Sequence, residues 1–219
     1  AKNDAHAVFM LGDMFDFWFT YRYVVPRGHI RLLGKMAELS DAGIELHFFA
    51  GNHDMWLFDY LPSEMNCKMY DDTAVFEYDG KVFYMGHGDG LGHTDRHYDR
   101  LRRVFRSRTN QRLFSLLPQW VTFGIAHGWS HKSRQSHVKN LNHYLGDERE
   151  GIVIHCKEVL QERQIDYCIF GHRHTPLLRE IETSSGNKSL YLNTGDFLHH
   201  RSYGVYSPEV GLQLKEYAE

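Results

Sequence analysis

The stretch IELHFFAGNHD, residues 44–54, joins a continuous apolar run to a polar tail. An apolar run of this length is typical of a buried β-strand, and Gly51 allows the backbone to turn sharply where the strand ends. A second apolar run, AVFML at residues 7–11, is followed in the same way by a glycine and Asp13. Between the two runs, residues 29–42 carry apolar side chains at helical spacing. The sequence therefore predicts a strand–helix–strand unit of an α/β fold.

Further strands and one further helix are expected along the rest of the chain. The dipeptide Asp79-Gly80 is a preferred two-residue hairpin turn and joins expected strands at 73–78 and 82–85. The remaining expected elements are a helix at 151–163, a strand at 167–170, a hairpin of 177–182 with 189–192, and short strands near 204–206 and 210–217. We find no internal repeat or linker, so the pattern favours a single domain.

The composition excludes several classes of protein. The chain has 219 residues and a net charge of −3, which fits neither a uniformly basic nucleic-acid binder nor an acidic disordered tail. Its three cysteines are odd in number and form no CxxC spacing, which favours a reducing cytoplasm over a disulfide framework. No apolar run approaches the ~18 residues that span a bilayer. Sixteen histidines are unusual and direct attention to metal or phosphate chemistry.

Residues 96–139 differ from the rest of the chain in charge. They carry ten Lys and Arg against one acidic residue, Asp99, so this stretch holds +9 while the remainder holds −12. Basic and apolar residues are interleaved, which leaves three interpretations: a solvated helical face, a nucleic-acid site, or a cap over an anionic amphiphile. The cap explains both compositions, with Trp120, Phe123 and Trp129 lining an acyl pocket or entering a membrane interface. We call residues 91–150 the lid and expect short helices in it.

Four expected strand ends carry metal-ligand residues directly after a glycine. They are GDMFD with Asp13, GNHD with Asn52 and His53, GHGD with His87, and GHRH with His172 and His174. Ligands of open α/β sheets bind outside the carboxyl ends of the strands, so these loops are expected to converge. Mixed oxygen and imidazole donors suit Mn²⁺, Fe or Zn²⁺ rather than a thiolate site.

The ordered set GDMFD, GNHD, GHGD and GHRH resembles the signature of the calcineurin-like metallophosphoesterases over nearly the whole chain. The resemblance implies a four-layer α/β/β/α sandwich of two mixed sheets flanked by helices, and two divalent metal ions with Mn²⁺ favoured. Asp13 would bridge the two ions. Asn52, His87 and His172 would complete the second metal site, and His174 would belong to the first. The structural alternatives are a helix cap for Asp13 and ordinary core packing for the histidines.

In the GNHD motif, His53 resembles the family histidine that contacts the phosphate or protonates the leaving oxygen, with Asp54 orienting its ring. Some relatives have Arg at this position, which would stabilise negative charge without delivering a proton. Asp16 is expected either to orient neighbouring groups or to cap a turn.

Finer details of the sequence resemble the branch of this family that acts in lipid A synthesis. These details are the aromatic extension at 13–18, the segment TDRHY at 94–98, the lid, the GHRHTP ending and NTGD at 193–196. They imply hydrolysis of the pyrophosphate of UDP-2,3-diacylglucosamine, a lipid-linked nucleotide, to UMP and 2,3-diacylglucosamine 1-phosphate. The implied location is the cytoplasmic face of the inner membrane, with peripheral binding to its inner-leaflet surface and with neither nucleic acid nor an obligate protein partner.

Three lid residues are candidate contacts to that substrate. Asp95 and Tyr98 match the family segment after GHGD, and Arg134 is a weaker candidate, one surface arginine among several. The structural alternatives are helix capping for Asp95 and core packing for Tyr98. Asn52 and His53 are also expected to contact the substrate.

One part of the family pattern is missing. Family members begin with a strand that carries Asp-x-His, roughly thirty residues before GDxxD, and Asp4-Ala5-His6 only imitates it. Asp4 and Asp13 would lie about 30 Å apart across the expected strand. We therefore expect residues 1–219 to form one domain that lacks its first strand. If the protein itself lacks that strand, we expect an impaired metal site. Two other functions stay open: a soluble phosphodiesterase or nucleotide pyrophosphatase of the same superfamily, and a non-catalytic scaffold.

Overall fold

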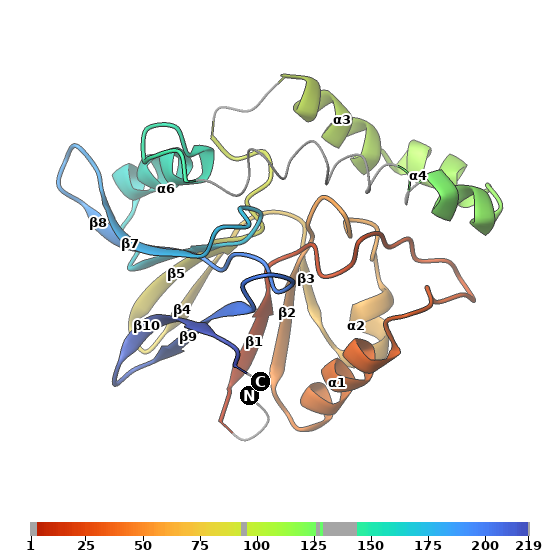
Figure 1. Cartoon of the computed structure of the whole chain (residues 1–219), viewed down its shortest axis with the longest axis horizontal. Coiled ribbons are helices and arrows are strands. Elements are labelled where there is room, and N and C mark those ends of the chain that lie inside the picture. Colours follow the sequence, from red (N-terminus) through yellow and green to blue (C-terminus); the bar gives the residue numbers. More distant parts are fainter. Residues whose placement is uncertain (1–3, 93–95, 126–127, 129–143, 219) are drawn as a thin grey trace. The chain divides into compact units, whose positions relative to one another are not determined.

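A computed structural model describes residues 4–92, 96–125, 128 and 144–218 (Figure 1). The chain divides into two compact units. Unit 1 comprises Ala1–Asp72 and Arg102–Lys132, and unit 2 comprises Thr73–Leu101 and Ser133–Glu219. Within the described ranges, no helix is both long enough and apolar enough to cross a membrane. A single domain with an inserted lid stays a prediction.

Unit 1 is built on a parallel three-stranded sheet in the order β1-β2-β3 (Figure 1). The strands are β1 (Ala7–Met10), β2 (Glu45–Phe49) and β3 (Lys68–Tyr70). Helix α1 (Ile30–Asp41) connects β1 to β2, which confirms the expected strand–helix–strand unit. Helix α2 (Tyr60–Met65) and β3 were not predicted, because six and three residues are too short to show a period.

The core of unit 1 includes the loop that follows β1. Phe15 and Trp18 are each 1% exposed, and their rings pack 4.6 Å apart. They lie in one cluster with Leu33 and Met36 of α1 and Phe48 of β2. The aromatic residues that follow Asp13 therefore anchor the loop that carries it.

The lid contributes helices to unit 1, as expected. Helix α3 (Arg96–Arg106) ends in this unit, α4 (Arg108–Ser115) follows it, and residues 119–125 are also helical. Phe114 of α4 packs on Trp56 at 4.8 Å between ring centroids, and Phe123 packs on Phe17 at 5.5 Å. We call these four residues the aromatic cluster. It fastens the lid segment of unit 1 to the loops that follow β1 and β2.

Unit 2 contains a mixed five-stranded sheet in the order β4-β5-β6-β8-β7. Strands β5, β6 and β8 run parallel, and β4 and β7 pair antiparallel at the edges. The bounds are β4 (Ala74–Tyr78), β5 (Lys81–Gly86), β6 (Tyr167–Phe170), β7 (Leu177–Glu182) and β8 (Lys188–Asn193). Asp79 and Gly80 both have positive φ, 54° and 71°, which confirms the expected hairpin turn.

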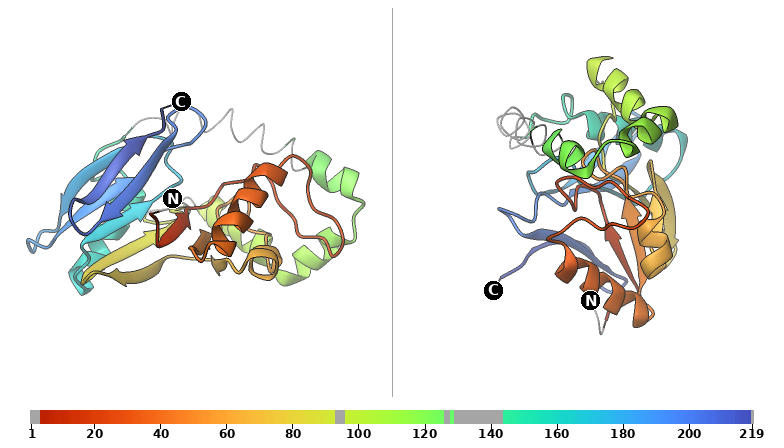
Figure 2. Two further views of the ribbon diagram at one scale, coloured as in Figure 1. Left: turned by 90° about the horizontal axis from the view of Figure 1, so that it is seen from below. Right: turned by 90° about the vertical axis from the view of Figure 1, so that its right-hand side faces the viewer.

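A helix and a second sheet pack against the strands of unit 2. Helix α6 (Gly151–Glu162) shares a buried cluster with β6 and β8, in which Leu160 of the helix lies with Phe170 of β6 and Tyr191 of β8. Strands β9 (Ser202–Ser207) and β10 (Gly211–Glu216) form a separate hairpin (Figure 2, dark blue), whose Tyr206 packs on Phe83 of β5 at 4.9 Å. Each unit thus combines sheet and helix, which confirms the predicted α/β fold class.

Candidate metal centre

The loop after β1 holds Asp13 in a left-handed backbone conformation, with φ at 54°. Its carboxylate oxygen Oδ1 accepts the backbone N–H of His53 at 2.8 Å. Gly51 makes this approach possible, because a Cβ atom at that position would lie 2.2 Å from Asp13 Oδ1. Asp13 therefore occupies a fixed place against the GNHD loop of the same unit.

Asp54 links the two loops of unit 1 from the inside. Its side chain is fully buried, Oδ1 accepts the N–H of Gly51 at 2.8 Å, and Oδ2 accepts the N–H of Met14 at 2.8 Å. A carboxylate that accepts backbone N–H groups stabilises the turns that supply them. Asp54 thus acts on the backbone of both loops, and its expected role in orienting the His53 ring stays a prediction.

The ring of His53 is oriented by a backbone carbonyl. Nδ1 lies 3.0 Å from the carbonyl oxygen of Asp16. Because a carbonyl oxygen only accepts hydrogen bonds, Nδ1 carries the hydrogen and Nε2 is the nitrogen left for an outside partner. Asn52 and His53 are both half-buried, in the turn that follows β2.

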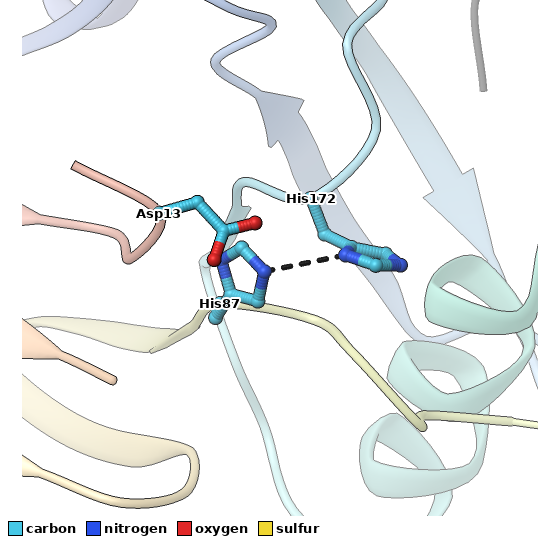
Figure 3. Close-up of side chains that lie close together, drawn as sticks. All are labelled: Asp13, His87 and His172. Atoms are coloured by element: carbon cyan, nitrogen blue, oxygen red, sulfur yellow. Dashed lines mark hydrogen bonds between the residues drawn. The ribbon is translucent and has the colours of Figure 1, made fainter. Parts of the chain in front are cut away.

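Unit 2 brings together two of the predicted metal ligands. His87 follows β5 and is 4% exposed, and His172 follows the adjacent parallel strand β6. The backbone N–H of Gly171 donates to the carbonyl oxygen of His87 at 3.0 Å, so the two loops are joined. His172 Nδ1 and His87 Nε2 lie 3.2 Å apart, marked by the dashed line in Figure 3. His172 adopts φ of 62°, an uncommon conformation for a residue with a Cβ atom.

This separation fits a divalent metal ion. Metal–imidazole bonds of about 2.0–2.1 Å place two ligands of one tetrahedral ion roughly 3.3 Å apart. The two nitrogens therefore already lie at the spacing of a ligand pair, on rings that are nearly perpendicular, with centroids 5.0 Å apart. The donors are borderline nitrogens, which suit the transition metals that the family resemblance implies.

The remaining predicted residues stay predictions. His174 is half-buried in the loop after β6, and Tyr98 lies in α3. Asp95, Arg134 and the lid residue Trp129 lie outside the described residues. Trp120 is 79% exposed, whereas Phe123 belongs to the aromatic cluster.

Sequence reasoning missed an ion pair beside the GHRH loop. Glu150, 4% exposed, lies at the residue before α6, and its Oε1 accepts a hydrogen bond from the guanidinium of Arg173 at 2.9 Å. Arg173 stands within the quoted GHRH motif, between two expected ligands. An acidic residue directly before a predicted helix was the available signal for its partner.

Comparison with known proteins identifies the family. The model of the calcineurin-like phosphoesterase family matches residues 1–176. A UDP-2,3-diacylglucosamine hydrolase of Porphyromonas gingivalis is 42% identical, over 94% of this chain and 81% of that protein. A UDP-2,3-diacylglucosamine hydrolase of Edwardsiella ictaluri is 28% identical, over 90% of this chain and 74% of that protein. The match spans all four motifs that carried the resemblance, since GHRH ends at residue 174. The chain belongs to the calcineurin-like phosphoesterase family.

Proposed function

We propose that this chain hydrolyses the pyrophosphate bond of UDP-2,3-diacylglucosamine and releases UMP and 2,3-diacylglucosamine 1-phosphate. The observation that carries the chemistry is the pair of ring nitrogens of His87 and His172, 3.2 Å apart at two adjacent strand ends. The substrate is suggested by the P. gingivalis relative, which is 42% identical over 94% of this chain.

Two divalent ions, with Mn²⁺ favoured, would be held by Asp13 and Asn52 of unit 1 and by His87, His172 and His174 of unit 2. Such ions supply Lewis acidity, which polarises phosphoryl oxygens and lowers the pKa of water. The chain's own contribution is to fix these donors in advance, through the hydrogen bond from His53 to Asp13 and the backbone contact between Gly171 and His87.

His53 would contact the phosphate or protonate the leaving oxygen. The Asp16 carbonyl holds the Nδ1 side of the ring, so Nε2 is the atom that would meet a phosphoryl oxygen. In the imidazolium form, Nε2 can donate its proton as the phosphorus–oxygen bond breaks. Asp54 supports this role through the backbone of the GNHD loop, and Asn52, Asp95, Tyr98 and Arg134 would add substrate contacts.

The exposed side chains of the lid segment in unit 1 are an argument for an amphiphilic substrate and for contact with the inner leaflet of the cytoplasmic membrane. Leu113 of α4 is 60% exposed, and Leu116 and Trp120 beyond the end of α4 are each 79% exposed. Arg108 and Arg112 of α4 are exposed as well. Exposed apolar side chains next to basic ones bind anionic lipid surfaces. These exposed apolar side chains are not needed to hold α4 in place, because Phe114 already anchors the helix in the aromatic cluster.

The experiment measures UMP release from UDP-2,3-diacylglucosamine by the complete gene product loaded with Mn²⁺, with and without Asp13→Ala. We expect Asp13→Ala to lower the rate of UMP release by more than the roughly 10–100-fold that follows the loss of a group hydrogen-bonded to a metal ligand. Activity that survives Asp13→Ala contradicts the metal mechanism. Preference for simple soluble diesters would point to a soluble phosphodiesterase, and hydrolysis of neither substrate would point to a scaffold.

A further inference from the structure

Glu150 and Arg173 form a largely buried ion pair in unit 2. The side chains are 5% and 15% exposed, and the nitrogen of Arg173 lies 2.9 Å from Glu150 Oε1. Oε1 also accepts the backbone N–H of Leu145 at 2.9 Å, near the end of the lid. Ion pairs of this kind contribute little net stability, because desolvation offsets their attraction. Stability alone therefore gives no reason for placing a charged pair here.

The position of the pair beside the metal-binding loop gives a reason. Arg173 stands between His172 and His174, and its backbone N–H donates to the carbonyl oxygen of Gly171 at 2.7 Å. Glu150 precedes α6, whose Ile152, Val153 and Cys156 are buried in the core of unit 2. The ion pair thus fastens the middle of the GHRH loop to a rigid helix end.

The charge of Arg173 also matters for a metal site. A guanidinium is a cation, and a cation in the same loop as two candidate metal ligands opposes the approach of a divalent ion. A carboxylate held at 2.9 Å neutralises that charge and fixes its direction.

We propose that Glu150 and Arg173 are positioning residues of the metal centre: the ion pair holds the GHRH loop in its ligating conformation, and Glu150 neutralises the charge of the residue that stands between His172 and His174. The inference rests on the proposed function only in requiring a divalent metal, not in requiring the lipid substrate. It predicts that the ion pair raises metal affinity even when no substrate is present.

The test is Mn²⁺ affinity, measured by electron paramagnetic resonance titration of the complete protein without substrate. Glu150→Gln removes the carboxylate that pairs with the guanidinium of Arg173, and we expect it to weaken Mn²⁺ binding about 10–100-fold. The double variant Glu150→Gln with Arg173→Gln removes both charges and leaves two amides able to hydrogen-bond, so it should recover most of that loss. A double variant as weak as Glu150→Gln would overturn the charge argument.

Arg179→Gln is the matched control. Arg179 of β7 anchors the same segment through Asp147 at 3.2 Å and Tyr144 at 3.1 Å, but it does not stand between histidines. We expect wild-type Mn²⁺ affinity for Arg179→Gln. An equal loss in Arg179→Gln, or wild-type affinity in Glu150→Gln, would overturn the proposal.

Two further readouts keep the result interpretable. If Glu150→Gln does not fold, Arg173→Lys is compared with Arg179→Lys. Lysine keeps the positive charge but loses the planar guanidinium that fits a carboxylate, so we expect Arg173→Lys to weaken Mn²⁺ binding more than Arg179→Lys. Equal Mn²⁺ affinities of the two variants would contradict the inference. UMP release by the wild type is assayed separately. A wild type that binds Mn²⁺ but does not hydrolyse the lipid would refute the proposed substrate and leave this inference standing.

Discussion

The two units hold their site residues by different physical means. In unit 1, Asp54 and Asp13 accept backbone N–H groups, so the loops after β1 and β2 are fixed by the chain itself. In unit 2, His87 and His172 meet through two ring nitrogens 3.2 Å apart, both of which are candidate ligands. The lesson is that unit 1 holds its candidate ligand against backbone N–H groups, whereas unit 2, whose loops also share a backbone hydrogen bond, sets two candidate ligands against each other, so an ion should stabilise unit 2 more.

The largest effect is expected from Asp54→Ala in unit 1. The substitution leaves the buried N–H of Gly51 and the partly buried N–H of Met14 without their acceptor, at about 1–3 kcal/mol for each. We expect the free energy of unfolding to fall by roughly 3–5 kcal/mol and activity to vanish, measured by urea denaturation and UMP release. Asp54→Asn keeps one acceptor oxygen and should lose about half as much stability. Equal stabilities for wild type and Asp54→Ala would show that the loops are held by something else.

Gly51→Ala tests the close approach within unit 1. The added Cβ atom would meet Asp13 Oδ1 at 2.2 Å and Asp13 N at 2.5 Å, so the Asp13 loop must move. We expect a loss of about 1–3 kcal/mol in the free energy of unfolding and a loss of metal-dependent activity.

The control for this substitution is Gly34→Ala within α1, where nothing lies within 4 Å of the added atom. This variant should gain about 0.5–1 kcal/mol, because alanine is the better helix former. Full activity in Gly51→Ala would contradict the proposal that Asp13 is a metal ligand.

Metal binding should stabilise the protein through the histidines of unit 2. Mn²⁺ at a hundred times its dissociation constant stabilises the state that binds it by about 2.7 kcal/mol, which raises the midpoint of thermal unfolding. We expect His172→Ala to abolish this rise. His200→Ala, which removes a histidine bonded to Asp196 in the same unit, should retain it. A rise that survives in His172→Ala would place the ion elsewhere.

A smaller effect is expected at the surface of the lid. Trp120→Ala removes an indole that is 79% exposed, so the fold should keep its stability while binding to anionic vesicles weakens several-fold. Tyr23→Ala removes another ring of unit 1, 83% exposed and outside the lid, and should leave vesicle binding unchanged. Equal binding by Trp120→Ala and wild type in a co-sedimentation assay would contradict the membrane proposal.

The smallest effect concerns pH and unit 1. Burial lowers the pKa of His47 on β2, although Glu45 opposes the shift through a hydrogen bond. A lowered pKa means that the folded state binds the proton less readily than the unfolded state, so the contribution of His47 to stability is present above about pH 6.5 and is lost as pH falls. We expect His47→Gln to flatten this acid limb in urea denaturation measured against pH. If stability falls in acid as steeply in His47→Gln as in the wild type, the loss belongs to other groups.

Most of the fold could be predicted because its strands and helices show clear hydrophobic patterns and end at turn-forming residues. The runs at 7–11 and 44–50 became β1 and β2, and Asp79-Gly80 became the expected hairpin turn. Elements too short for a period, α2 and β3, could not be found this way. The division of the lid between two units also escaped prediction, since it depends on the aromatic cluster, which joins residues far apart in the sequence.

The candidate site divides in the same way. The glycine-led motifs predicted which residues end neighbouring strands, and the structure confirms that His87 and His172 come together. The contacts that hold these residues were not predictable, because they link separate motifs: the carboxylate of Asp54 to Met14, the carbonyl of Asp16 to His53, and Glu150 to Arg173. Motif spacing reports where a strand ends, whereas such contacts depend on the folded path of the chain.

The most direct test of the proposed function compares UMP release from UDP-2,3-diacylglucosamine with UMP release from the same nucleotide sugar without its acyl chains. Both reactions use the complete gene product, equal Mn²⁺ and detergent-dispersed lipid. A lid that binds acyl chains predicts a much larger kcat/KM for the diacylated substrate, and predicts that this preference falls in Trp120→Ala while hydrolysis of the deacylated sugar does not change. Equal kcat/KM values for the two substrates would contradict the account.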